Sequence, residues 1–167
     1  VARGLTLDYG GRDGVNGLDL AIPHGCKFGL LGPNGAGKST TLKLFMGMLR
    51  PDAGSLSVLG QDAPARNPEL RARIGYVPER HHIYRWMTVG EVVRFVRAFY
   101  PTWNDNLCDE LLGQYGLAMG KKVEQLSHGM TTKLALVLAL SHEPELLILD
   151  EPTTGLDPTL RRAFFAI

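Results

Sequence analysis

The chain has 167 residues, 44% of them hydrophobic and 21% charged, and its formal net charge is +1. This length suits one globular domain, and the near-neutral charge predicts no strong attraction to nucleic acid or to anionic lipid. No apolar run of about 18 residues occurs, so no membrane-spanning helix is predicted, and the two distant cysteines argue against a disulfide framework or zinc site and suit a reducing compartment.

The first elements predicted along the chain are two short strands. Apolar and polar residues alternate over 5–9 and again over 18–22, and the Gly-rich residues 10–17 lie between them. Alternation with period two around a turn predicts an antiparallel pair with one buried face. The elements expected next are a strand at 27–31, a helix at about 39–49, and strands at 55–60 and 74–77.

Residues 80–140 are predicted to form an α-helical subdomain inserted between strands. A capping box of Thr88 and Glu91 opens its first helix. A second helix is expected from about Asn104 to Tyr115, with Gly116 as its C-cap.

Ser127 is expected to cap a third helix that ends near Ser141, before a strand at 145–149 that is buried on both faces. The chain is therefore predicted to be a single α/β domain over residues 1–167. Its expected parts are a P-loop NTPase core, meaning a mostly parallel sheet with flanking helices, an N-terminal antiparallel β subdomain and the inserted helical subdomain.

Residues 32–40 read GPNGAGKST and match the phosphate-loop pattern G-x-x-x-x-G-K-[ST]. Glycines permit positive φ, so successive backbone N–H groups can point towards phosphate oxygens. Lys38 supplies a positive charge for the β and γ phosphates, and the Ser39 hydroxyl is a ligand for Mg²⁺. The flanking strand and helix favour this interpretation over a Gly-rich turn without a ligand. The predicted nucleotide-binding residues here are Gly32, Asn34, Gly35, Ala36, Gly37, Lys38, Ser39 and Thr40.

Residues 146–151 read LLILDE, an apolar strand that ends in two acids. Ligands of parallel sheets bind at the carboxyl ends of the strands. We expect Asp150 to hold Mg²⁺ and Glu151 to act as the general base that polarises an attacking water. Taken alone, the two acids could merely end a strand, but the phosphate loop in the same chain favours the catalytic interpretation.

Five motifs occur in a fixed order: GPNGAGKST, YVPE at 76–79, LSHGM at 126–130, LLILDEP and TTGLDP at 153–158. The ordered set covers nearly the whole chain and resembles an ATP-binding-cassette (ABC) ATPase subunit. The Trp103 segment, the LSHGM loop and TTGLDP look most like bacterial exporters whose ATPase and membrane parts are separate chains. The resemblance implies ATP and Mg²⁺ as cofactors, hydrolysis of ATP coupled to transport, and a cytoplasmic location on the membrane face.

The resemblance also implies roles for single residues. Tyr9 matches the aromatic residue that stacks on adenine, and the alternative is a strand-end tyrosine in the core. Glu79 stands where the family usually has a Gln that senses Mg²⁺ and the γ-phosphate, so we expect it to be a catalytic residue and a metal ligand with altered detail. Asp157 matches the acid of a loop that crosses the dimer interface, or else it begins the last helix.

Family members work as head-to-tail dimers, so a second ABC subunit is an expected partner. In that arrangement Ser127 and Gly129 of one subunit meet the γ-phosphate held by Lys38 of the other. His128 and Met130 stand where the family usually has Gly and Gln, and we expect the LSHGM loop to work as a variant. A role for Ser127 as helix N-cap is compatible with this contact.

The segment RHHIYRWM at 80–87 corresponds to the family's surface for an integral membrane permease. Tyr84, Trp86 and Met87 are the expected anchors, because aromatic residues and Met are enriched at interfaces. The equally weighted alternative is that they pack inside the helical subdomain. A metal role is not expected for the pair His81 and His82, which has no further ligands nearby in the sequence.

The family also places a histidine beyond the acid pair, and this chain ends at Ile167 before that position. His24, His81, His82, His128 and His142 all precede Asp150. We therefore expect the domain to be incomplete at its C-terminus. The 167 residues alone are expected to bind Mg-ATP weakly and to hydrolyse it negligibly.

The sequence is also compatible with two other functions. A soluble ABC ATPase acting on ribosomes or DNA is less favoured, because Lys38 and Asp150 are 112 positions apart with only ordinary helices between them, and no basic stripe occurs. A nucleotide-binding fragment without turnover is the third possibility. Export is favoured over import, and the transported substrate is left open among lipid, drug, peptide and glycan.

Overall fold

The computed structural model describes residues 1–10, 14–62 and 67–151. These residues divide into two compact units, Val1–Arg71 and Ala72–Ile167, and each unit is described by itself. Each unit carries part of the predicted site.

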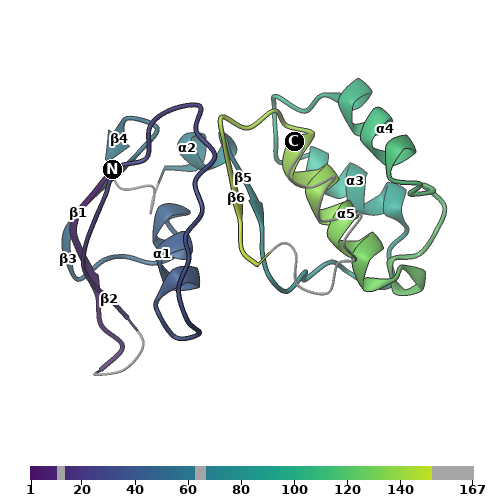
Figure 1. Cartoon of the computed structure of the whole chain (residues 1–167). Helices are drawn as coiled ribbons and strands as arrows, with labels where there is room; N and C mark the ends of the chain where they lie inside the picture. Colours follow the sequence, from purple (N-terminus) through teal and green to yellow (C-terminus); the bar gives the residue numbers. More distant parts are fainter. Residues whose placement is uncertain (11–13, 63–66, 152–167) are drawn as a thin grey trace. The chain divides into compact units, whose positions relative to one another are not determined.

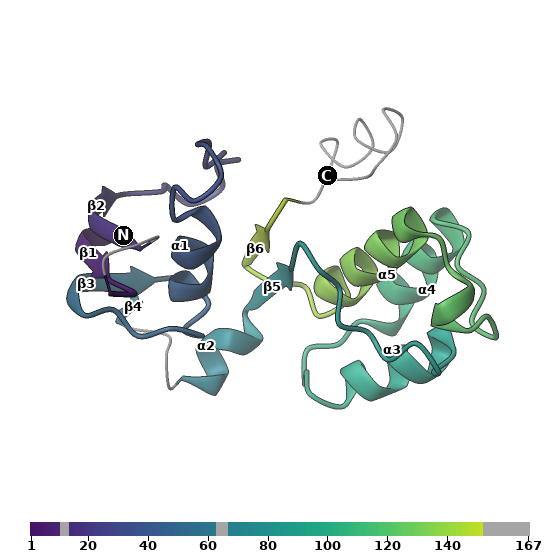
Figure 2. The same ribbon diagram turned by 90° about the horizontal axis from the view of Figure 1, so that it is seen from below.

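The first unit contains a four-stranded antiparallel sheet in the order β2-β1-β3-β4. Its strands are β1 (Ala2–Leu7), β2 (Val15–Leu20), β3 (Ala53–Val58) and β4 (Gln61–Asp62). Leu5 of β1 is opposite Leu18 of β2, which confirms the predicted antiparallel pair. The helix α1 (Lys38–Phe45) lies beside this sheet in both views (Figure 1, Figure 2).

The helix α1 ends four residues before the predicted limit of Leu49. Gly47 adopts φ 66°, and the amides of Gly47 and Met48 donate to the carbonyls of Leu44 and Lys43 over 2.9 Å each. This pair of bonds is a Schellman C-cap, which a glycine in the left-handed region makes possible. The sequence prediction followed the apolar spacing and overlooked this glycine.

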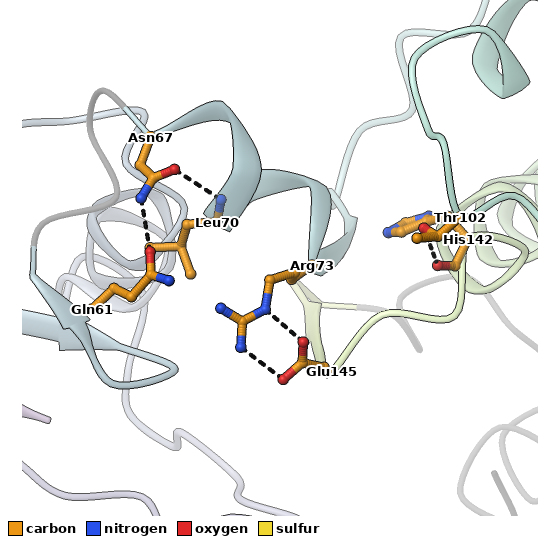
Figure 3. Close-up of polar contacts among 7 residues, drawn as sticks. All are labelled: Gln61, Asn67, Leu70, Arg73, Thr102, His142 and Glu145. Atoms are coloured by element: carbon orange, nitrogen blue, oxygen red, sulfur yellow. Dashed lines mark hydrogen bonds and ion pairs between the residues drawn. The ribbon is translucent and has the colours of Figure 1, made fainter.

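A short helix that the sequence analysis did not predict, α2 (Pro68–Ala72), follows the sheet. The side-chain oxygen of Asn67 accepts from the amide of Leu70 over 3.0 Å, and its amide nitrogen donates to Gln61 over 2.8 Å (Figure 3). Asn67 and Pro68 are a favourable pair for a helix start, because Asn accepts from the first turn and Pro has a suitable φ.

The predicted strand at 27–31 is wrong for the part of the chain that the structure describes. No strand is assigned there, and the side chain of Leu31 is 92% exposed. Among the described residues, the sheet of the first unit consists of β1 to β4, so residues 27–31 do not pair with it. Without a neighbouring strand, the backbone N–H and C=O groups of an apolar segment bond to water instead. Apolar sequence alone is therefore not sufficient for strand formation.

The second unit combines a parallel strand pair with a group of helices (Figure 1, Figure 2). Its strands are β5 (Ile74–Val77) and β6 (Leu146–Leu149), paired in parallel from Ile74 opposite Leu146 to Val77 opposite Leu149. Its helices are α3 (Val89–Arg97), α4 (Asp105–Gln114), the 3₁₀ turn η2 (Val123–Gln125) and α5 (His128–Leu140).

The predicted N-terminal caps of α3 and α5 are confirmed, since Thr88 and Glu91 form the capping box of α3 and Ser127 caps α5. Asn104, which was predicted only as the approximate start of the second helix, is the N-cap of α4. The helices share a buried core that α5 also extends to β5. The buried members of this core include Val89, Val93, Cys108, Leu112, Leu134 and Val137.

The strand β6 differs from the prediction that both its faces are buried. Ile148 is buried, whereas the other three residues of β6 are half-buried. Among the described residues, β6 pairs with β5 on one side only, so its second edge gains no cover from a neighbouring strand. None of the helices described in either unit is long and apolar enough to cross a bilayer.

Candidate functional site

The phosphate loop of the first unit has the backbone that its glycines predict. Gly35 and Gly37 adopt φ 82° and φ 81°, in the left-handed region that other residues rarely enter. Gly37 is the N-cap residue of α1, and no side chain caps this end of the helix. The N-terminal amides and the dipole of α1 therefore face the loop, which is the arrangement that binds phosphate.

The side chain of Lys38 closes over this loop. Its ammonium donates to the carbonyl of Gly32 over 2.8 Å and to that of Pro33 over 2.9 Å. Both acceptors are neutral, and a phosphate oxygen is a stronger partner for an ammonium. The Lys38 ammonium is thus held against the loop by two hydrogen bonds, and a phosphate oxygen can replace the carbonyls as its partner.

Gly37 is also a point of close packing. A Cβ at this position would lie 2.5 Å from the carbonyl oxygen of Gly14, which precedes β2. The carbonyl of Gly37 accepts from both the amide and the hydroxyl of Thr41, over 2.8 and 2.9 Å. These contacts fix the start of α1, so the spatial position of the loop depends on the absence of a side chain at residue 37.

In the second unit, the parallel strands bring three predicted acids to one edge. Glu79 follows the end of β5 by two residues, while Asp150 and Glu151 follow β6 directly. The amide of Asp150 donates to the carbonyl of Val77 over 2.9 Å, so the ladder continues to this residue. Asp150 is 5% exposed, whereas Glu79 and Glu151 are exposed. Such an edge is where open α/β sheets bind ligands.

Tyr76 reports the electrostatic character of this edge. Burial raises the pKa of its phenol, and the negative charges of Asp150 and Glu79 raise it further. Two carboxylates thus act on one tyrosine, which supports an assembled acidic edge. The sequence analysis did not select Tyr76, although its position inside YVPE could have suggested it.

The LSHGM loop begins α5 in the second unit. The Ser127 hydroxyl accepts from the amide of Met130 over 3.3 Å, and its carbonyl accepts from the amide of Thr131 over 2.9 Å. Ser127 and His128 are exposed, and Gly129 is half-buried. The loop is therefore a capped helix N-terminus on the surface, which suits contact with an anion from outside the chain.

The segment after Glu79 runs beside the LSHGM loop, and we call residues 81–88 the bracing segment. The carbonyls of Arg85 and Met87 accept from the amides of Glu124 and Val123 over 3.0 and 2.9 Å. Thr88 forms an antiparallel bridge with Lys122. The bracing segment thus contacts the chain that leads into the LSHGM loop at successive points.

The bracing segment also reaches the first turn of α5 through His81. The Nε2 atom of His81 lies 3.0 Å from the hydroxyl of Thr132, and its ring stacks on that of His128 with centroids 6.1 Å apart. Burial lowers the pKa of His81, and the neighbouring His128 lowers it further. Both effects favour the neutral form of the His81 ring. The expected absence of a metal role for His81 and His82 is not tested by these contacts.

The remaining predicted residues lie outside these clusters. Tyr9 follows β1 and is 55% exposed, so the alternative of a core tyrosine is wrong and its surface remains available for stacking. Asp157 lies outside the described residues.

The aromatic residues proposed for the permease surface divide into two groups. Tyr84 and Trp86 are 53% and 64% exposed, with ring centroids 5.8 Å apart. Met87 packs against the buried core of the helices instead and is half-buried. The sequence analysis missed Phe95 of α3 and Phe99, which follows α3, and both extend the exposed aromatic cluster through ring contacts.

Comparison with known proteins identifies the family. A family profile described as "ABC transporter" matches residues 15–154, most of the chain. The chain belongs to the ABC transporter family. The motif order, the loop at α1 and the acidic strand edge therefore occur in a family for which they were expected.

Several relatives of this ABC chain have descriptions. It is 37% identical over 98% of its length to the "Probable multidrug ABC transporter ATP-binding protein YbhF" of Escherichia coli, of which it covers 29%. It is 42% identical over 95% of its length to the "Nod factor export ATP-binding protein I" of Burkholderia orbicola, of which it covers 54%. The chain thus spans about half or less of the length of these curated relatives.

Solved structures agree with the predicted fold. A structure described as an ATP-binding subunit of an ABC transporter matches 99% of the ABC chain with a TM-score of 0.86 and 29% identity, and the chain covers 71% of it. A dimeric ATP-binding cassette bound to ADP and phosphate matches with a TM-score of 0.85 at 22% identity, which supports the fold alone. The predicted class, a P-loop NTPase core with β and helical additions, is confirmed.

Proposed function

We propose that this chain is the nucleotide-binding part of an ATPase that powers export through a separate membrane permease. The phosphate loop carries the proposal, because its two left-handed glycines, the start of α1 and Lys38 together form an anion site. The relatives named for multidrug transport and Nod factor export support the direction of transport. The transported substrate is set by the permease.

The residues of the chain have distinct roles in the proposed reaction. Lys38 balances negative charge on the terminal phosphates, and Tyr9 stacks on the base. Glu151 orients the attacking water and accepts its proton as general base. Glu79 senses the γ-phosphate through the attacking water. Its carboxylate replaces the Gln amide that the family usually has at this position.

On sequence grounds alone we propose Mg²⁺ as the second cofactor, with Ser39 of the first unit and Glu79 and Asp150 of the second unit as its protein ligands. All three offer oxygen atoms, which Mg²⁺ prefers, and the described residues contain no group of three or more His, Cys, Asp or Glu that could hold a metal by themselves. This donor set fits an ion that keeps waters and phosphate oxygens as further ligands. When bound, Mg²⁺ supplies charge stabilisation at the β and γ phosphates.

The second partner proposed is another ABC subunit in head-to-tail arrangement. At the capped start of α5, Ser127 is exposed and Gly129 is half-buried, so an anion presented by another molecule can reach this helix end. Asp157 is assigned to the same interface on sequence grounds. Since each nucleotide would then contact two chains, binding would stabilise the closed dimer.

The permease surface proposed is the exposed aromatic cluster of Tyr84, Trp86, Phe95 and Phe99. Its four rings are 45% to 65% exposed and follow one another at centroid distances of 5.3 to 6.0 Å. Exposed contiguous aromatic side chains are typical of interfaces. This contact would place the chain at the cytoplasmic face of the membrane.

Two matched pairs of variants in the intact protein test the ATPase. Lys38→Ala should weaken ATP binding by about 10- to 100-fold, the loss expected for hydrogen bonds to a charged group. Lys43→Ala, on the exposed face of α1, is the control. Glu151→Gln should keep binding and lower kcat by about 100- to 10,000-fold, whereas the exposed Glu143→Gln should not. Turnover at the parental rate in Glu151→Gln would show that the base is misassigned.

Membrane co-purification tests the permease surface. Replacing Tyr84 and Trp86 by Ala should release the intact protein from membranes, because the anchors of an interface are its large aromatic residues. Met87→Ala should instead lower stability and leave membrane binding intact, because Met87 packs inside. Co-sedimentation with ribosomes would contradict the transporter.

A further inference from the structure

The LSHGM loop and the segment that follows Glu79 are distant in sequence but adjacent in the second unit. His81 and Thr132 are 51 residues apart, and their side chains meet at 3.0 Å. Thr132 is 3% exposed, so this contact lies at the buried side of α5. Its Oγ1 atom also donates to the carbonyl of His128 over 3.1 Å.

These two contacts determine the role of each atom. A threonine hydroxyl has one hydrogen, and the bond to the His128 carbonyl uses it. The Nε2 atom of His81 must therefore donate to Thr132. The neutral ring then carries its hydrogen on Nε2 and presents an acceptor at Nδ1, a buried atom with no hydrogen-bond partner among the described residues.

The position of His81 gives this bond a consequence for the proposed ATPase. Glu79 lies two residues before His81 at the end of β5, and Ser127 lies one residue before the start of α5. The ring of His81 packs on His128, the neighbour of both Ser127 and Gly129. His81 thus connects two proposed nucleotide contacts. One is Glu79 at the end of β5, and the other is the start of α5, which is assigned to the nucleotide held by the partner subunit.

The ladder further along the bracing segment strengthens this connection. The bonds from Arg85 and Met87 to residues 123 and 124 hold the approach to the LSHGM loop, while His81 holds the first turn of α5 behind it. Ser127 is thereby bounded on both sides by contacts with one segment. The exposed Tyr84 and Trp86 lie within the same segment.

We propose that His81 is a positioning residue, which fixes Ser127 and Gly129 relative to the Glu79 end of β5 by its hydrogen bond to Thr132 and its stack on His128. This inference deepens the proposed function and rests on it for its effect on turnover. The contact itself is independent of that function. His81 touches neither nucleotide nor water in this role.

The first test measures the contact without ATP. Nitrogen-15 shifts of the His81 ring in the intact protein should report the tautomer with hydrogen on Nε2. His81→Leu should speed exchange of the Met130 and Thr131 amides by about 2- to 10-fold, the change expected for one lost hydrogen bond. His81→Gln, which can place a donor near the former Nε2, should restore slow exchange.

Matched variants separate this role from general destabilisation. His82→Leu changes the exposed neighbouring histidine and should leave exchange at Met130 and Thr131 unchanged. Thr132→Val removes the acceptor while keeping the buried volume, and Thr132→Ser retains it. Because Thr132→Val should add little to His81→Leu, the pair is expected to be non-additive.

The second test measures turnover. His81→Leu and Thr132→Val should each lower kcat by about 3- to 10-fold and leave the ATP dissociation constant unchanged, since the phosphate loop is intact. Unchanged exchange and kcat in both variants would overturn the positioning role. A parallel loss of ATP affinity and global stability would overturn it in favour of a packing role. If the parent protein shows no ATPase activity, the proposed function fails, and the exchange and tautomer measurements still decide the contact.

Discussion

The two loops assigned to phosphate are built in different ways. The loop at 32–37 in the first unit is made by backbone: two left-handed glycines, a helix start without a side-chain cap, and a lysine that bonds to carbonyls of its own loop. Its shape is encoded within about ten consecutive residues.

The LSHGM loop in the second unit is made by side chains and distant contacts. Ser127 caps α5, and the bracing segment 81–88 holds the loop from about 40 to 50 positions away in sequence. The comparison teaches that a phosphate contact can be specified locally or through tertiary packing. The two designs should therefore fail under different perturbations.

The largest expected effect comes from adding a methyl group to the backbone-made loop. Gly37→Ala combines left-handed strain, about 1–2 kcal/mol, with overpacking against the Gly14 carbonyl, about 1–3 kcal/mol. We expect the free energy of unfolding to fall by roughly 2–5 kcal/mol and ATP binding to be lost. Urea denaturation and equilibrium ATP binding measure the two effects.

Gly60→Ala is the matched control for this variant. Gly60 adopts φ 76°, but a Cβ there meets no atom within 4 Å. It should show the strain alone and leave ATP binding intact. If both variants behaved alike, the close approach to Gly14 would have no energetic role.

The difference between the loops also explains what could be predicted from sequence. The phosphate loop, the caps at Thr88 and Ser127, and the apolar strand that ends in the two acids all depend on local patterns, and they could be predicted. The helix end at Gly47 had a local signal as well, which the apolar spacing outweighed.

Other features depend on partners that a local pattern does not contain. Residues 27–31 are apolar enough for a strand, yet strand formation requires a neighbour. Met87 packs against the core of the helices, which is built from residues distant in sequence, and the role of His81 follows from its contact with Thr132. A sequence without known contacts cannot distinguish such residues from exposed ones of the same type.

A smaller effect tests the side-chain-made loop. Ser127→Ala removes the N-cap of α5, at a cost of about 1 kcal/mol of stability, and also the proposed phosphate contact. We expect kcat to fall by about 10- to 100-fold, the range for a lost hydrogen bond to a charged group.

Asn104→Ala provides the control, because it removes the cap of α4 in the same unit. It should cost a similar amount of stability and leave kcat unchanged. Equal kcat in the two variants would show that Ser127 acts only as the N-cap of α5 and makes no phosphate contact that affects turnover. The comparison of the two loops would then no longer concern two phosphate contacts.

The smallest expected effect is a pH dependence of stability that differs between the two units. His142 follows α5, is 2% exposed, stacks on Tyr100 at 4.0 Å between ring centroids, and its carbonyl accepts from Thr102 (Figure 3). Burial lowers the pKa of His142, and the backbone groups of Leu138 and Ile74 oppose this more weakly.

Since the folded state disfavours protonated His142, the unfolded chain binds the proton more readily. The free energy of unfolding should therefore fall as pH drops below about 6.5, the ordinary histidine value, by at most about 1.4 kcal/mol per pH unit for this group. His81, whose pKa is also lowered, adds to the loss. The first unit contains only the exposed His24, so lowering the pH to 5.5 should reduce the amide protection factors, which correct for the pH dependence of intrinsic exchange, in α5 and not at the start of α1. His142→Phe should flatten the pH dependence of protection in α5, and an equal loss of protection in both units would show that the buried histidine does not set it.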